Sequence, residues 1–464
     1  MRAILWTLIL LSLLFAGDAA LADEARFPQP QFESGYVLPE TPVPVPRALL
    51  LEYLDVAVLI GVLLLAGYLA LRLRSRRALF LLTIFSLLYF GFWRKGCVCA
   101  VGALQNVTQA LSVTSSILPL VVTAFFLLPL IFTLLFGRVF CSSVCPLGAI
   151  QDLVVVRPMR VPAPLGQALG MLPYLYLGLV VLFAATGAGY MICRFDPFVS
   201  FFRLSGSAGI LYTGAGFLIA GTVLARPYCR FLCPYGVLLK WVSRFSKKHL
   251  TITPDVCVQC RLCENSCPFG AIRKPSEGMD PGKFSIAGRR SVLLAALLPA
   301  LVIGGVYFGS VMKGSLSLVH PTVRLADRVS GIDSGQDLQR TVSVETFLES
   351  ERSSADLFGE AQALRNRIGK GGMILGGFLG LVFGGKLIGL SVRRERRGYE
   401  PDRAECLSCG RCIEMCPVEH VRLHGDEADM NKLLTKYQRQ SRGKGDVELT
   451  PEEIKSLVDE REIT

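Results

Sequence analysis

The residues with the clearest chemistry are eight cysteines that occur in two runs of the same spacing. The runs are CVQCRLCENSCP, with Cys257, Cys260, Cys263 and Cys267, and CLSCGRCIEMCP, with Cys406, Cys409, Cys412 and Cys416. Each follows C-x2-C-x2-C-x3-C-P, a spacing in which three thiolates hold three corners of a 4Fe–4S cube. The sequence therefore predicts two 4Fe–4S clusters. Zinc, which also binds thiolates at C-x2-C spacing, is the alternative.

In two-cluster ferredoxins the fourth cysteine of each run serves the other cluster. The predicted ligand sets are Cys257, Cys260, Cys263 and Cys416 for the first cluster, and Cys406, Cys409, Cys412 and Cys267 for the second. Two long apolar segments separate the runs, so the two halves can meet only if these segments form a hairpin. We expect a bacterial-type α+β ferredoxin domain that is split in sequence and whole in space.

A second pattern is Cys-x3-Cys-Pro, which occurs twice. It places Cys141 and Cys145 in FCSSVCPLGAI, and Cys229 and Cys233 in YCRFLCPYGVL. Two thiols at i and i+4 lie on one face of a helix, so both can reach one ligand. Because thiolates prefer soft metals, the four cysteines predict an inner site with a third iron–sulfur or mononuclear iron centre. Free buried thiols or structural zinc are the alternatives.

The stretch GCVCAVGALQNV resembles part of the first Cys-x3-Cys-Pro loop, because its GALQNV is a near-copy of GAIQDL at 148–153. Such a copy suggests an old duplication with inverted placement, which is a common origin of membrane proteins with a central site. Cys97 and Cys99 of this stretch, together with Cys193, predict an outer metal site. A disulfide is the alternative, because the outside of a cell is oxidising.

The apolar residues come in runs, and these runs predict an all-α polytopic membrane protein. The chain has 464 residues, 52% of them hydrophobic, and a formal net charge of +12. About seven runs approach the roughly 20 residues that a spanning helix needs. They are 49–71, 78–93, 117–136, 170–192, 208–225, 291–312 and 371–392. The Lys and Arg excess fits the cytoplasmic loops of such a protein, so no nucleic-acid partner is required.

Residues 1–22 have the basic start, apolar centre and small-x-small end of a secretory signal, with an uncleaved anchor as the alternative. The Arg-rich linker 72–77 is then cytoplasmic. Alternation from there places the ferredoxin halves and the C-terminus in the cytoplasm of a bacterial inner-membrane protein, with its N-terminus periplasmic. The expected segments are a signal peptide (1–22), a Pro-rich periplasmic linker (23–48), a membrane domain with the tandem Cys-x3-Cys-Pro repeat (49–240), ferredoxin half one (241–290), a transmembrane hairpin (291–392) with a periplasmic loop (313–370), ferredoxin half two (393–424) and a charged cytoplasmic tail (425–464).

These motifs resemble the membrane-bound polyferredoxins of the NosR/NapH type. The resemblance depends on CSSVCP and CRFLCP with apolar segments between them, followed by the ferredoxin runs, and GCVCAVGALQNV resembles the NosR-like branch. It implies that electrons pass between a membrane quinol pool and periplasmic reductases, or that the protein maintains those enzymes. NosR-type proteins also have a periplasmic flavin domain before the first span. Here the Pro-rich residues 23–47 stand in that place.

Redox centres near both faces would relay electrons across a hydrocarbon core about 30 Å thick. We therefore expect an electron-transfer protein that connects quinol or a cytoplasmic donor with a periplasmic redox enzyme or cytochrome. It would be a redox conduit or an oxidoreductase subunit rather than a stand-alone enzyme. An assembly factor that reduces or delivers copper for a metalloenzyme is the alternative. An ion-pumping subunit is disfavoured, because Lys386 is the main charged residue within the predicted spans.

Overall fold

The computed structural model describes most of the chain from residue 48 onwards. The described residues are 48–96, 99–112, 118–156, 158–159, 161–190, 192, 195–204, 207–252, 261–275, 281–335, 341–349, 352–391, 398–416 and 419. The predicted signal peptide, the charged tail and four of the predicted ligands lie outside these residues. The four ligands are Cys97, Cys193, Cys257 and Cys260.

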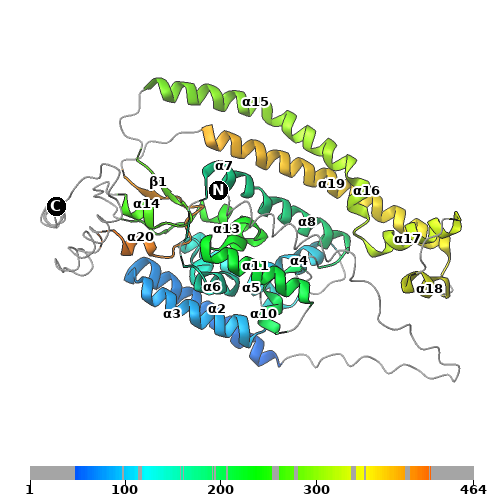
Figure 1. The fold of residues 1–464 in the computed structure, drawn as a ribbon, viewed down its shortest axis with the longest axis horizontal. Coiled ribbons are helices and arrows are strands. Elements are labelled where there is room, and N and C mark those ends of the chain that lie inside the picture. The colour runs from blue at the N-terminus through cyan, green and yellow to red at the C-terminus, as the bar shows by residue number, and fades with distance from the viewer. Residues whose placement is uncertain are drawn as a thin grey trace, which may run out of the picture.

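The first half of the described chain is a bundle of apolar helices joined by short turns (Figure 1). Three of its elements are π-helical turns, η1, η2 and η3. In chain order the elements are α2 (Leu49–Tyr68), η1 (Leu69–Leu73), α3 (Arg76–Ser86), η2 (Leu87–Trp93), α4 (Ala100–Ser112), α5 (Leu120–Phe136), η3 (Phe140–Val144), α6 (Pro146–Leu153), α7 (Ala163–Leu169), α8 (Leu172–Thr186), α10 (Val199–Arg203), α11 (Ala208–Val223), α12 (Pro227–Phe231) and α13 (Pro234–Ser243).

Five helical stretches in the described part are long and apolar enough to cross a membrane. They are Leu49–Leu73, Arg76–Trp93, Pro164–Thr186, Val292–Val311 and Ser354–Ser391. Two shorter apolar helices, Leu120–Phe136 and Ala208–Val223, coincide with the remaining predicted runs. Only 6% of the Val292–Val311 window is buried inside the protein. An apolar surface so widely exposed is stable against lipid rather than water.

The region that the sequence assigned to an outer loop, 94–116, contains the buried helix α4. Its residues Ala100, Val101, Leu104 and Gln105 are buried, and α4 packs against α5 and α8. The loop therefore turns back into the helical core. A run of 13 residues is shorter than a membrane span, which is why hydropathy alone does not show it as part of the bundle.

The predicted hairpin consists of α15 (Pro281–Val311) and α19 (Ser354–Ser391), which lie side by side (Figure 1). Glycines permit this close approach. A Cβ on Gly309 would collide with the carbonyl oxygen of Gly372, and one on Gly376 with that of Gly305. Gly304 of α15, by contrast, faces open space.

The connection between the hairpin helices is itself helical. It contains α16 (Lys313–Ser317), α17 (Pro321–Asp333) and α18 (Val342–Glu349), and α19 begins well before the predicted span. Helices α17 and α18 share a small apolar core with the first turns of α19. The predicted loop 313–370 is thus largely a folded helical cap on the hairpin.

The two halves of the ferredoxin region, which the hairpin separates in sequence, contact each other in space. Strand β1 (Ile272–Arg273) pairs antiparallel with β2 (Glu400–Pro401), with Ile272 opposite Pro401. Helix α14 (Leu262–Ser266) packs against α20 (Arg411–Glu414). Figure 1 shows these four elements together at one end of the molecule. One apolar core unites cysteines from both halves, so the split segments form a single structural unit.

Candidate metal centres

The ferredoxin unit brings Cys267 of the first run close to three cysteines of the second. Burial raises the pKa of Cys412 well above its ordinary value, and the nearby Cys406, Cys409, Cys267 and Cys263 raise it further. Burial raises the pKa of Cys406 to about 12; Ser408 N–H opposes this rise, while Cys409 and Cys267 add to it. The predicted second set thus lies near Cys263 of the first set, and the division of the ligands between two clusters stays a prediction. Of the first set, Cys263 and Cys416 are described, and both are buried in the same core.

Backbone groups of the same unit donate hydrogen bonds to the sulfur atoms. Ala271 N–H donates to Cys267 Sγ at 3.4 Å, and Ser408 N–H donates to Cys406 Sγ at 3.4 Å. Ser408 has a positive φ of 56°, which turns its N–H back toward the sulfur two residues earlier. Donors of this kind stabilise negative charge on thiolates and tune cluster potentials.

The two Cys-x3-Cys-Pro loops come together in one cavity. Cys141, Cys145, Cys229 and Cys233 all line it. Each loop ends at a proline that starts a helix, Pro146 of α6 and Pro234 of α13, where a missing N–H costs nothing. The two helices thus begin directly after the last cysteine of each loop. The opposite wall is the ferredoxin unit, through Phe269, Glu405 and Leu407.

In the cavity, deprotonation of the four thiols is unfavourable, because the thiolates would be buried and would repel one another. Burial raises the pKa of Cys145 well above its ordinary value, and Cys229, Cys99 and Cys141 raise it further. Burial also raises the pKa of Cys229 to about 11, although Arg226 opposes the rise. Iron ions supply the positive charge that such a set lacks and deprotonate the thiols that they bind. Four thiolates are the number and kind of donor that a 4Fe–4S cluster takes.

Cys99 lies near the inner thiols rather than far from them. It contributes to the raised pKa of both Cys145 and Cys233. The sequence assigned Cys99 to an outer site across the membrane from these residues, with Cys97 and Cys193. Cys99 lies closer to the inner thiols than the sequence predicted, because helix α4, which begins at Ala100, packs into the core with its N-terminal end.

The two copies of the repeated motif, GALQNV and GAIQDL, each place a glutamine that accepts a hydrogen bond from a distant backbone N–H. Gln105 of α4 accepts a hydrogen bond from Ile192 N–H at 3.0 Å, and Gln151 of α6 accepts one from Tyr228 N–H at 3.0 Å. In the sequence each of these donors is followed by a cysteine. Gln151 Nε2 then donates to Cys229 Sγ at 3.3 Å. Gln105 is fully buried, and its Nε2 has no partner among the described residues.

Buried ion pairs join the cavity to the ferredoxin unit. Asp152 lies 2.9 Å from Arg76, 3.3 Å from Arg226 and 3.1 Å from Arg411, the first residue of α20. Burial alone would raise the pKa of Asp152, but Arg226, Arg76 and Arg411 together hold it well below its ordinary value. Asp152 is therefore ionised, and it fixes α20 against the membrane helices.

Two arginines link individual cysteine loops to the ferredoxin. Arg226 is 1% exposed, donates to the carbonyl oxygens of Cys141 and Ser142, and is electrostatically coupled to both Cys229 and Cys409. Arg138 donates to Cys141 Sγ at 3.8 Å and to Ala404 O at 3.1 Å. We did not predict either role from the sequence, because the spacing of the motifs does not indicate these partners.

Comparison with known protein families confirms the predicted cofactor. A family described as "4Fe-4S binding domain" matches residues 118–164 and 208–253, which contain the two Cys-x3-Cys-Pro loops. A second family of the same description matches residues 250–273, which contain the first ferredoxin run. The chain therefore binds 4Fe–4S clusters.

Several curated proteins are similar to this chain. An uncharacterized protein of Methanocaldococcus jannaschii, MJ0750, is 30% identical over 39% of the chain and 77% of its own length. The regulatory protein NosR of Stutzerimonas stutzeri is 30% identical over 30% of the chain and 21% of its own length. The methylamine utilization ferredoxin-type protein MauN of Paracoccus denitrificans is 30% identical over 31% of the chain and 52% of its own length.

These matches, together with the cysteine motifs and the apolar helices, define a membrane-bound iron–sulfur protein of electron transport. The chain belongs to the NosR/NapH-type family of membrane polyferredoxins. It spans about half or less of the length of NosR and MauN. No solved structure matches it significantly.

Proposed function

We propose that the protein relays electrons through the membrane between quinol or a cytoplasmic donor and a periplasmic redox enzyme. The observation that carries this proposal is the inner cavity, which is lined on one side by four thiols and on the other by the ferredoxin unit. Two iron–sulfur sites in adjacent walls form a path for electrons. The similarity to NosR and MauN supports a role in electron transfer or in the maturation of a redox enzyme.

In this proposal the ferredoxin cysteines hold two clusters, and Cys141, Cys145, Cys229 and Cys233 hold a third. Clusters supply one-electron oxidation and reduction when bound. The chain itself holds them in register through Arg138 and Arg226, each of which contacts a Cys-x3-Cys-Pro loop while interacting with the ferredoxin half. The positive charge of these buried side chains stabilises the additional electron of a reduced cluster.

The proposed path continues to the periplasmic face. Cys97, Cys99 and Cys193 would form a further site on this path, beside the inner site rather than across the membrane from it, because Cys99 lies near Cys145. Quinol or a soluble donor would deliver electrons, and a periplasmic enzyme or cytochrome would receive them. The positive-inside rule supports a bacterial inner-membrane location with the ferredoxin in the cytoplasm.

One observation favours the alternative function, which is maturation of a metalloenzyme. Cys99 is a fifth thiol near a set of four, and one cluster needs only four ligands. A spare soft ligand suits the transient binding of Cu(I). The metal content of the purified protein separates the two functions.

The test is iron and acid-labile sulfide per chain on anaerobically purified full-length protein, with EPR of the reduced state. We expect about 12 irons, because three 4Fe–4S clusters contain that number. Cys145→Ser should remove about 4 irons and one EPR signal. Ser143→Ala in the same loop is the matched control and should keep all of them.

Two other results would contradict the relay. About 8 irons that are unaffected by Cys145→Ser would mean that the inner cavity holds no cluster. If wild type binds copper, and Cys99→Ser loses the copper while its iron content stays unchanged, maturation is supported instead.

A further inference from the structure

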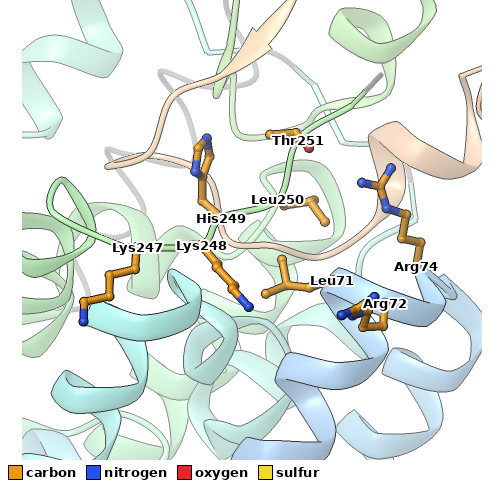
Figure 2. Close-up of a pocket in the computed structure, with 8 residues that line it drawn as sticks. All are labelled: Leu71, Arg72, Arg74, Lys247, Lys248, His249, Leu250 and Thr251. Atoms are coloured by element: carbon orange, nitrogen blue, oxygen red, sulfur yellow. The ribbon is translucent and has the colours of Figure 1, made fainter. Parts of the chain in front are cut away.

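A basic pocket lies at the junction of two apolar helices, away from the cysteine cavity. It has a volume of about 420 Å³ and is lined by Leu71, Arg72, Arg74, Lys247, Lys248, His249, Leu250 and Thr251. Figure 2 shows Leu71 and Leu250 in its middle, Lys248 on one side, and Arg72 and Arg74 on the other. The pocket therefore combines an apolar floor with a cationic rim.

The positions of its walls follow from backbone structure. Arg72 lies in the last turn of η1, at the end of the candidate span Leu49–Leu73. The segment that carries Lys247 and Lys248 is attached to the end of α5, because their N–H groups donate to Leu134 O and Leu135 O, each at 2.9 Å. Two apolar helices thus end at the pocket, which is where hydrocarbon gives way to headgroups.

Most of the positive charge in this pocket has no ion-pair partner among the described residues. Arg74 pairs with Glu419. In the described part of the chain, Arg72, Lys247 and Lys248 have no carboxylate within ion-pair distance, and all three are exposed. His249 adds little charge at neutral pH, because burial and the nearby Arg403 lower its pKa. Among the described residues, three cations of this pocket are thus open to an anionic ligand.

We propose that this pocket binds the phosphate headgroup of an anionic phospholipid. Lys248 and Arg72 would bracket the phosphate, and the acyl chains would continue along the exposed apolar surface of the Leu49–Leu73 span, where Leu73 is 51% exposed. Basic pockets between membrane helices on the cytoplasmic side are suited to such headgroups. The proposal depends on the membrane location and not on the electron-transfer role, so either can fail alone.

The test titrates full-length protein in neutral detergent with phosphatidylglycerol or phosphatidylcholine and counts bound lipid by native mass spectrometry. Wild type should retain one phosphatidylglycerol in preference to phosphatidylcholine. Arg72→Gln with Lys248→Gln should weaken this binding roughly 30-fold, because each basic residue near an anionic lipid contributes about fivefold. Arg77→Gln with Arg244→Gln changes the same charge at exposed positions outside the pocket, so it should leave the binding unchanged.

Three results would overturn the proposal. The first is equal retention of the two lipids by wild type. The second is an unchanged affinity in the Arg72 and Lys248 double variant, provided that its thermal unfolding midpoint matches wild type. The third is displacement of the lipid by millimolar inorganic phosphate, which would make the ligand a free anion rather than a lipid.

Discussion

At the scale of single residues, Asp152 marks a functional difference between the two copies of the repeated motif. It stands in GAIQDL where the other copy, GALQNV, has Asn106. Among the described residues, Asn106 donates to Gly102 O in its own helix, at 3.4 Å. Asp152 binds arginines from three distant segments, and one of them belongs to the ferredoxin. This carboxylate therefore gives one copy an ion pair with the cluster-bearing unit that the asparagine of the other copy does not make.

Asp152→Asn should destabilise this docking by about 3 to 5 kcal/mol, because it leaves buried arginines without their counter-charge. The loss should be full at pH 7 and shrink only below pH 4. The reason is that the folded pKa of Asp152 is lowered, so its contribution is present above the ordinary carboxyl pKa and disappears as pH falls. Unfolding midpoints in detergent measure this change. Asp333→Asn, at an exposed position, is the control, and an equal loss in both variants would contradict the role of Asp152.

At the scale of elements, the hairpin shows what glycine contributes to helix packing. Gly372, Gly376, Gly380 and Gly384 of α19 all face α15, and an added Cβ on any of them would meet atoms of that helix. Gly385 on the same helix faces open space. In lipid, helices associate through close van der Waals contact rather than through the hydrophobic effect, so loss of the glycine surface directly weakens the pair.

Gly376→Ala should destabilise the hairpin by about 1 to 3 kcal/mol, the usual effect of overpacking. Gly385→Ala should be neutral or stabilising by up to about 1 kcal/mol, since alanine is the better helix former. Thermal unfolding of the two purified variants in the same detergent makes the comparison. If Gly376→Ala is as stable as Gly385→Ala, the close contact between α15 and α19 does not exist in the membrane.

The sequence predicted those elements whose signal is local. The apolar run 49–71 coincides with the candidate span Leu49–Leu73, and the cysteine runs pointed to 4Fe–4S binding, which the family matches confirm. It did not predict the burial of α4 or the helical cap around α17, because short amphipathic segments are buried by tertiary contacts. The roles of Arg138 and Arg226 also remained hidden. Their partners lie far away in the chain, and no spacing rule reports such pairs.

At the scale of the whole molecule, the orientation of the hairpin can be tested directly. A reporter fused after Arg397 should score cytoplasmic, because the Arg-rich segment beside it remains inside. The same reporter inserted after Gly335, in the helical cap, should score periplasmic. Activity of both fusions on one side of the membrane would show that α15 and α19 do not cross it, and the split ferredoxin would then need another explanation.

The pairing of β1 with β2 has a consequence for biosynthesis. Cys267 leaves the ribosome long before Cys406, Cys409 and Cys412, the three thiols that it meets in the folded protein. A nascent chain that has made β1 but not α19 has only one of these four thiols and an unpaired strand. If these four thiols hold the second cluster as predicted, that cluster can be completed only after both hairpin helices have been synthesised. A chain whose hairpin fails to form would then leave this site empty, even if the inner site had already received its cluster.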